Sequence, residues 1–273
     1  MPSKKYKLIL ITTLVLSASF FSCTTTKTAD TTRITPQKKI TPTIINHGNR
    51  DEKNISLTFD ADMTASMQKK LFNKQIKSLY DKKITDTLEQ TGTPATIFIT
   101  GLWAQTYPEE TKSISQNPLY EIANHSLTHS GFTKNCYGLT IVTDKNKELI
   151  ETQKILNNLT GITPKYFRFP GGCYEQKDLE IVNNAELQAI GWDAISGDAF
   201  QPNSQKIINN VLNRTTNGSI IVMHLNGAHN APATSKALPT IIKKLKEKGY
   251  TFVKLSELLK DQDSNAIFDF QKK

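Results

Sequence analysis

Short apolar runs alternate with longer segments along most of this chain. Runs of four to eight apolar or alternating residues predict strands, and apolar residues recurring every three or four positions predict helices. The predicted strands cover 55–59, 95–100, 119–124, 166–169, 187–194, 219–225 and 251–254. The predicted helices cover 78–90, 108–115, 144–159, 176–185, 204–213 and 235–248, with a short one ending near 260.

This order amounts to about seven β–α repeats without an obvious domain break. Alternating repeats of this kind predict a parallel sheet with helices outside it. Seven strands over residues 52–262 favour a closed or nearly closed α/β barrel in a single domain, and an open doubly wound sheet is the alternative. No glycine-rich phosphate loop opens any helix, which argues against a nucleotide ligand.

The first 23 residues have the pattern of an export signal. Lys4, Lys5 and Lys7 precede an apolar stretch over 8–21, which is too short to span a membrane comfortably. The stretch ends at Ser22-Cys23, and a small residue followed by cysteine resembles the lipobox of bacterial lipoproteins, where that cysteine is lipidated. An ordinary signal peptide or an uncleaved anchor is the alternative.

Residues 24–51 are rich in Thr, Lys and Pro and lack apolar periodicity, so we predict a flexible tether. Residues 263–273 form a polar C-terminal tail. With Cys23 lipidated, we expect an exported envelope lipoprotein, periplasmic or attached to the outer membrane, with the membrane as one partner.

The net charge of +9 comes from lysines spread over the whole chain. No dense basic patch is interleaved with aromatic residues, so nucleic acid is not an expected partner. We expect a monomer.

Polar side chains follow the predicted strands one after another. They are Asp60 and Asp62, His125 and His129, Arg168, Asp193 and Asp198, and finally His224 and Asn226. The carboxyl ends of parallel strands form one face, where function sits in such folds. We therefore expect these side chains to converge on one cleft.

The residue types suit metal-assisted hydrolysis of an amide or ester. Two imidazoles and one carboxylate leave coordination positions open, as in catalytic zinc sites. His125 and His129 supply the imidazoles, and one of the two aspartates would bind the metal while the other acts as base. Arg168 would keep the base ionised, and amides of the 170–172 turn would stabilise an oxyanion.

His224 is the candidate general acid. A carboxylate partner such as Asp198 would keep this imidazole protonated, so that it can transfer a proton to a leaving amine.

Five ordered motifs resemble those of NodB-type polysaccharide deacetylases. They are Thr58-Phe59-Asp60-Ala61-Asp62, His125-Ser126-Leu127-Thr128-His129, Arg168-Phe169-Pro170-Gly171-Gly172, the segment from Trp192 to Asp198, and Gly218-Ser219-Ile220-Ile221-Val222-Met223-His224. The resemblance implies a distorted (β/α)7 barrel, a divalent metal that is usually zinc, and removal of N- or O-linked acetyl groups from an acetylated polysaccharide.

The resemblance also implies a role for each matching residue. Asp60 would be the base, Asp62, His125 and His129 the metal ligands, Arg168 the partner of the base, Gly171 the oxyanion amide, Asp198 the partner of the acid His224, and Trp192 and Val222 the lining of the substrate pocket. Two features depart from the family. Ala61 separates the usually adjacent aspartates, and Ala199 replaces a tryptophan, which leaves one wall of the sugar cleft either open or filled by Phe200.

Two other functions remain open on the same fold. One is a catalytically silent glycan-binding lipoprotein, which the presence of Asp60 and His224 disfavours. The other is an amidase or esterase acting on a non-carbohydrate acyl group. The glycan is also open among peptidoglycan, a secreted amino-sugar polymer and O-acetylated xylan.

Two cysteines lie beyond the predicted signal. Cys136 follows the histidine motif, and Cys173 follows the Pro-Gly-Gly turn directly. If both loops face the same cleft, a disulfide would clamp them together in an oxidising compartment. Two buried free thiols are the alternative.

Overall fold

The computed structural model describes residues 41–227 and 230–260. The predicted signal with Cys23, most of the predicted tether and the predicted C-terminal tail lie outside these residues. Within the described part of the chain, every helix is too short or too polar to span a bilayer.

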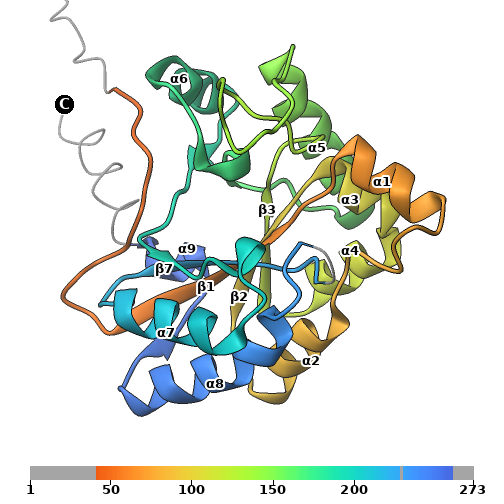
Figure 1. Cartoon of the computed structure of the whole chain (residues 1–273). Coiled ribbons are helices and arrows are strands. Elements are labelled where there is room, and N and C mark those ends of the chain that lie inside the picture. The colour runs from red at the N-terminus through yellow and green to blue at the C-terminus, as the bar shows by residue number, and fades with distance from the viewer. Residues whose placement is uncertain (1–40, 228–229, 261–273) are drawn as a thin grey trace, which may run out of the picture. The chain divides into compact units, whose positions relative to one another are not determined.

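The described residues form one curled parallel sheet of eight strands (Figure 1). The strands are β1 (Asn54–Ala61), β2 (Ala95–Ile99), β3 (Tyr120–Asn124), β4 (Tyr166–Phe167), β5 (Gln188–Ala189), β6 (Ala194–Ile195), β7 (Ile220–His224) and β8 (Thr251–Phe252). Their order is β5-β4-β3-β2-β1-β7-β6, and β8 pairs with the start of β1. Because every pairing is parallel, the strand ends meet at one face. The predicted distorted (β/α)7 barrel in a single domain is confirmed.

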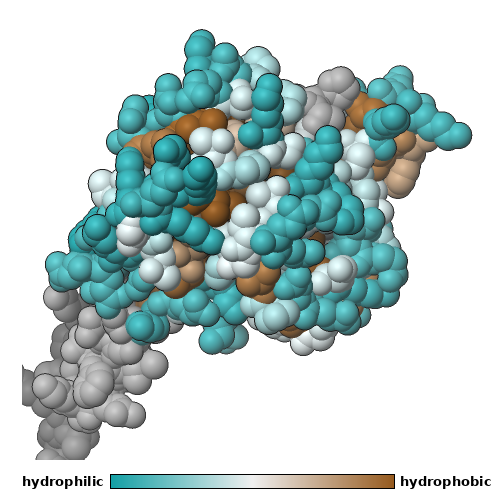
Figure 2. All heavy atoms as spheres, turned by 90° about the horizontal axis from the view of Figure 1, so that it is seen from below, coloured by the Kyte–Doolittle hydropathy of each residue, from teal (hydrophilic) through white to brown (hydrophobic). Residues whose placement is uncertain are grey.

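Helices lie outside the sheet. They are α1 (Ala65–Phe72), α2 (Lys82–Gln90), α3 (Gly101–Thr106), α4 (Pro108–Gln116), α5 (Lys145–Thr160), α6 (Gln176–Asn184), α7 (Ser204–Arg214), α8 (Thr234–Glu247) and α9 (Leu255–Leu258), with 3₁₀ turns η1 (Pro170–Gly172) and η2 (Asp198–Phe200). Helix α8 buries Leu238, Ile241 and Leu245 and exposes Lys243 and Lys246. Seen from below, the surface is accordingly mostly hydrophilic, with separate hydrophobic patches (Figure 2).

The alternation in β1 separates the core from the functional site. Ile55, Leu57 and Phe59 are fully buried in the main apolar cluster beneath the helices. Thr58 and Asp60 point to the other face of the strand, inside the curl, because successive side chains of a strand alternate. Every second position is therefore free to carry polar chemistry while its neighbours form the core.

The predicted strand over 187–194 is wrong in one respect, because it is two strands at opposite ends of the sheet. β5 pairs with β4 and β6 pairs with β7, so the barrel stays open between them. The chain crosses this seam at Gly191, where a Cβ atom would lie 2.1 Å from the Asn46 side-chain oxygen. A side chain at this position would displace the Asn46 amide group, so glycine lets the segment before β1 pass close to the seam.

The end of the predicted tether also requires correction. Ile45 forms a β-bridge with Ile190, and His47 forms one with Ser219. Ile45 packs against a buried cluster that includes Ile190, which gives this segment an apolar reason to stay on the domain. Residues near the seam therefore join the fold before the predicted boundary at 52.

Two short helices, α1 and α3, were not predicted, and α2 begins four residues later than expected. Residues before α2 are held by other contacts, because the Leu79 amide donates to the Tyr107 hydroxyl at 2.8 Å and its carbonyl accepts from the Trp103 indole at 2.9 Å. Asp81 then caps α2 by accepting from the Lys83 amide.

Candidate active site

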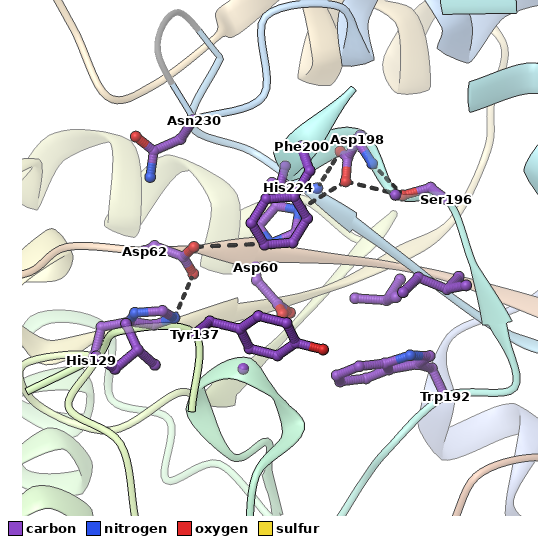
Figure 3. A pocket seen from close by; sticks show the side chains of 16 residues that line it. Asp60, Asp62, His129, Tyr137, Trp192, Ser196, Asp198, Phe200, His224 and Asn230 are labelled. Atoms are coloured by element: carbon purple, nitrogen blue, oxygen red, sulfur yellow. Dashed lines mark hydrogen bonds and ion pairs between the residues drawn. The ribbon is translucent and has the colours of Figure 1, made fainter. Parts of the chain in front are cut away.

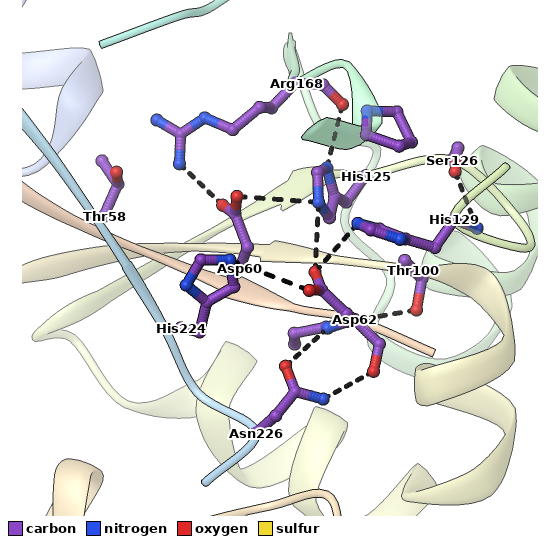
Figure 4. A network of polar contacts seen from close by, with 12 residues as sticks. Thr58, Asp60, Asp62, Thr100, His125, Ser126, His129, Arg168, His224 and Asn226 are labelled. Carbon is purple, nitrogen blue, oxygen red and sulfur yellow. Dashed lines mark hydrogen bonds and ion pairs between the residues drawn. The ribbon is translucent and has the colours of Figure 1, made fainter. Parts of the chain in front are cut away.

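The end of β1 carries two buried carboxylates on one side of the strand. Asp60 and Asp62 are each 5% exposed and are separated by Ala61, so both side chains face the interior of the curl (Figure 4). Asp60 lies level with His224 on β7 and with Phe98 on β2. The β1 terminus is therefore the centre of the polar network.

Asp62 meets the two imidazoles of the histidine motif. Its Oδ1 atom lies 3.2 Å from Nε2 of His125 and 3.3 Å from Nε2 of His129. Nδ1 of His125 is 2.9 Å from the Arg168 carbonyl, so it is assigned the proton and donates there, which leaves the Nε2 lone pair facing Asp62. Asp62 Oδ1 and His125 Nε2 are buried and lack a hydrogen-bond partner. Two orphaned ligand atoms beside a third nitrogen fit a bound metal ion.

The pKa shifts of the two histidines are compatible with a cation bound between Asp62, His125 and His129. Burial lowers the pKa of His129 to about 4, so this imidazole is neutral at neutral pH and able to bind metal. For His125, burial is outweighed by Asp60 and Asp62, which raise its pKa. The two carboxylates thus favour positive charge where the three ligand atoms meet.

A second group of three ligand atoms, from Asp60, Asp62 and His224, lies close enough for a metal. It fits less well, because Arg168 Nη1 donates to Asp60 Oδ1 at 2.7 Å. His224 is also held in its cationic form, as described below. The group of Asp62, His125 and His129 is the better candidate.

Arg168 is fully buried, and three contacts hold its guanidinium group in one orientation. It donates to Asp60, its Nη2 atom donates to the Gly191 carbonyl at 3.2 Å, and its guanidinium lies 3.9 Å from the Phe98 ring centroid. Arginine stacks well on aromatic faces and keeps its charge when buried. Asp60 therefore has a fixed cationic partner on the side away from Asp62.

His224 and Asp198 form a second pair on the other side of Asp62. His224 Nδ1 lies 2.7 Å from Asp198 Oδ1, and the His224 amide donates to Asp198 Oδ2 at 2.8 Å. Ser196 and Thr234 donate to the same carboxylate. Although burial opposes it, Asp198 raises the pKa of His224 to about 10. The imidazole keeps its proton, and its Nε2 atom faces Asp62 at 3.8 Å.

A cavity of about 290 Å³ opens above these groups (Figure 3). It is lined by Asp60, Asp62, His129, Tyr137, Leu139, Gly171, Trp192, Ile195, Ser196, Gly197, Asp198, Ala199, Phe200, Val222, His224 and Asn230. The cavity thus includes Gly171, Trp192 and Val222, the residues expected to contact substrate. Their roles are taken up with the proposed function.

The turn at Gly171 lies against a disulfide bond. Cys136 and Cys173 are bridged, with their Cα atoms 5.9 Å apart. Gly171 has φ +64°, and a Cβ atom there would lie 2.7 Å from the Cys136 sulfur. The Gly172 amide donates to the Phe169 carbonyl, so the Gly171 amide is the remaining donor of the turn. Glycine is therefore required at 171 both by the backbone angle and by the bridge.

Two residues that support the site were given no role from the sequence. Glu148, in the first turn of α5, accepts from the Leu127 and Thr128 amides at 2.8 Å each and is 7% exposed, which fixes the loop of the histidine motif. Asn226 bonds to both the amide and the carbonyl of Asp62. An acidic residue in the first turn of a helix is typical of an exposed position near the helix N-terminus, so no pattern in the sequence indicated that Glu148 is buried. Asn226 was noted as a strand-end residue but without a role.

One expected residue lies elsewhere. Asp193 accepts from the Ile220 amide at the start of β7 and pairs with Arg50 at 2.7 Å. It therefore lies at the opposite end of β7 from His224 and does not reach the site.

The comparison with known proteins identifies the family. The sequence model of the family described as polysaccharide deacetylase matches residues 47–190, more than half of the chain. The chain belongs to the polysaccharide deacetylase family. The resemblance seen in the sequence is thus confirmed at the level of the family.

Several members of the family are similar to this chain. A peptidoglycan-N-acetylglucosamine deacetylase of Bacillus cereus is 30% identical over 179 residues, covering 66% of this chain and 63% of the relative. A bifunctional xylanase/deacetylase of Pseudobutyrivibrio xylanivorans is 28% identical, covering 81% of this chain but 33% of the relative. The chain therefore spans less than two thirds of either protein.

Solved structures share the fold. A peptidoglycan N-acetylglucosamine deacetylase crystallised with a naphthalenyl N-oxidanyl-benzamide superposes with a TM-score of 0.67 at 27% identity, covering 79% of this chain and 92% of that one. A mutant of a CE4 family pseudoenzyme gives a TM-score of 0.65 at 25% identity, covering 80% and 71%.

Proposed function

We propose that this protein is a metal-dependent hydrolase that removes N-linked acetyl groups from the glycan strands of peptidoglycan. A single observation carries the proposal. Two charged pairs flank the candidate metal ligands, and they favour opposite charges on the two groups that face the cavity. Asp60 is paired with Arg168 at 2.7 Å, and His224 is paired with Asp198 at 2.7 Å. One pair presents a carboxylate and the other a protonated imidazole to the same cavity.

Asp62, His125 and His129 would hold the metal, and zinc suits one carboxylate and two imidazoles. When bound, the metal supplies Lewis acidity that polarises the acetyl carbonyl and makes a water molecule more acidic. The remaining steps rest on side chains of this chain.

Asp60 takes a proton from the attacking water, and the hydrogen bond from Arg168 at 2.7 Å fixes the orientation of its carboxylate. The Gly171 amide donates to the oxygen of the tetrahedral intermediate. His224 then transfers its proton to the leaving amine as the carbon–nitrogen bond breaks. The products are acetate and a free amino sugar. Trp192 and Val222 would contact the sugar and the acetyl methyl group.

The class of substrate rests on the relatives. Peptidoglycan deacetylases recur among them, including proteins of Bacillus cereus and Listeria monocytogenes. The test is acetate release from purified peptidoglycan, an N-acetylated amino-sugar polymer and O-acetylated xylan, each with and without a chelator. Release from peptidoglycan that stops with chelator supports the proposal. Release from xylan alone would instead favour an O-acetyl esterase.

The second function to consider is a silent glycan-binding protein. This alternative is considered because one similar structure is that of a CE4 family pseudoenzyme. The two complete proton-transfer pairs disfavour it here. Binding of peptidoglycan without acetate release would support it.

The first 23 residues, which resemble the signal of a bacterial lipoprotein, support a proposal for where the protein acts. We propose export and acylation at Cys23, which would hold the domain near a membrane surface in the envelope. Radiolabelled palmitate is expected to label the full chain but not a Cys23→Ala variant. Unlabelled protein recovered from the cytoplasm would contradict this.

A further inference from the structure

Two aromatic side chains at the rim of the cavity are unusually exposed. Tyr137 is 71% and Phe200 74% exposed, the highest values among the large hydrophobic residues of the described ranges. Their ring centroids are 5.7 Å apart with the planes tilted by 34°. Two large rings that contact each other while both stay in solvent expose apolar area without a covering partner.

The two rings come from segments that are distant in the fold. Tyr137 belongs to the stretch between β3 and α5, and Phe200 ends η2 after β6. β3 and β6 are separated in the sheet by β2, β1 and β7, yet both rings line the same cavity as Asp62 and His224. Figure 3 shows Tyr137, Phe200 and Trp192 around this cavity. We call Tyr137 and Phe200 the aromatic rim.

The disulfide fixes Tyr137 in place. Cys136, the preceding residue, is bonded to Cys173 beyond the 170–172 turn. The backbone of Tyr137 has φ +49°, an angle unfavourable for a side chain of this size. A Cβ atom on Gly171 would lie 3.2 Å from the Tyr137 ring, so the ring packs directly on the candidate oxyanion turn. The bridge, the turn and the ring are thus in contact with one another.

The lining of the rim indicates what it contacts. The cavity also presents the apolar side chains of Leu139, Ile195 and Val222, and Phe200 is preceded by the short side chain of Ala199. A pyranose ring with equatorial substituents presents an apolar face of axial C–H groups, which packs well on an aromatic ring. A neutral sugar ring therefore fits this rim better than a charged group.

We propose that the aromatic rim packs against a pyranose ring of the glycan chain, and that the Cys136–Cys173 bridge positions Tyr137 for that contact. This inference rests on the proposed deacetylase function. It makes Tyr137 and Phe200 specificity-determining residues and the disulfide a positioning element. The rim then favours sugar oligomers over small acetyl compounds that lack a ring to pack on it.

The experiment compares kcat and KM on an N-acetylglucosamine oligomer and on glyceryl triacetate, which has no sugar ring. Tyr137→Ala and Phe200→Ala are expected to raise KM for the oligomer about five- to tenfold, the effect of losing about one aromatic contact. The KM for glyceryl triacetate rises less than the KM for the oligomer, because glyceryl triacetate has no sugar ring to pack on the rim. Tyr137→Phe and Phe200→Tyr restore the oligomer KM, because they keep the ring.

The control is Phe72→Ala, which removes an aromatic ring that is 66% exposed at the end of α1, away from the lining residues. It leaves both substrates unaffected. The Cys136→Ala/Cys173→Ala variant raises the oligomer KM as Tyr137→Ala does. If that double variant does not fold, Tyr137→Ala with the bridge intact still decides the role of the ring.

The outcomes separate this inference from the proposed function. If the wild type releases no acetate from any substrate, the proposed function fails, and the rim is then tested by oligomer binding. Trp192 lines the cavity and is one of two tryptophans in the chain, so its fluorescence reports that binding. Unchanged oligomer KM and binding in both alanine variants would overturn the inference.

Discussion

Arg168 Nη1 donates to Asp60 Oδ1 at 2.7 Å, and both side chains are buried. The bond joins the segment after β4 to the end of β1, and two strands, β3 and β2, separate β4 from β1 in the sheet. The same Arg168 supplies the carbonyl that orients His125. One residue therefore links the candidate base to the candidate metal ligands.

Arg168→Met is expected to reduce kcat by ~10²-fold, because Asp60 loses the buried partner that donates to its Oδ1 atom and fixes its orientation toward the attacking water. The rate on an N-acetylated oligomer measures this. The matched control is Arg50→Met, since Arg50 forms an equally short but more exposed pair with Asp193 at the other end of β7. Equal losses in both variants would mean that Arg168 acts only on stability.

The His125→Ala/His129→Ala variant is expected to lose bound metal, since two of three ligands are removed. Metal analysis of the purified protein measures the stoichiometry. His47→Ala serves as the control, because His47 lies on the segment that bridges Ser219. Full metal content in the double variant would place the metal at the other candidate group.

Asp198→Asn is expected to shift the alkaline limb of the rate profile to lower pH. Asp198 raises the pKa of His224 to about 10, so the wild-type imidazole stays protonated up to that region. Without the carboxylate, the pKa of His224 falls, and the acid is lost at lower pH. A pH series of kcat measures the shift. Thr234→Val, which removes one hydrogen bond but keeps the charge of Asp198, shifts the limb less. An unmoved limb in Asp198→Asn would exclude His224 as the acid.

Glu148→Gln is expected to weaken metal binding by ~10-fold, because the loop of the histidine motif loses charge-assisted bonds to two amides. Metal titration measures this. Glu151→Gln, one turn along α5 and partly exposed in a pair with Lys154, is the control and is expected to have no effect. Equal affinities in Glu148→Gln and wild type would show that the loop holds its shape without this carboxylate.

The strand-end residues could be read from the sequence because parallel strands bring their ends together whatever the detailed twist. Asp60, Asp62, His125, Arg168 and His224 follow runs of recognisable period, so their convergence was predictable. Asp198 was expected both at the end of the fifth predicted strand and as a partner for His224, whereas Asp193, expected beside it, lies at the opposite end of β7.

Features set by tertiary contacts were not predictable. β5 and β6 have two residues each, too few to show a period, and they pair with strands at opposite ends of the sheet. Contact between Tyr137 and Phe200 depends on how two loops meet across the sheet. No local pattern in the sequence encodes such long-range relations.

The most direct test of the central claim is acetate release from peptidoglycan by the Asp60→Asn variant, measured together with its metal content. Asp60→Asn keeps the size of the side chain but cannot accept the proton of the attacking water. The account predicts full metal content with turnover reduced by ~10²-fold or more. Turnover near that of the wild type would contradict the account, because a carboxylate at this position would then not be the base.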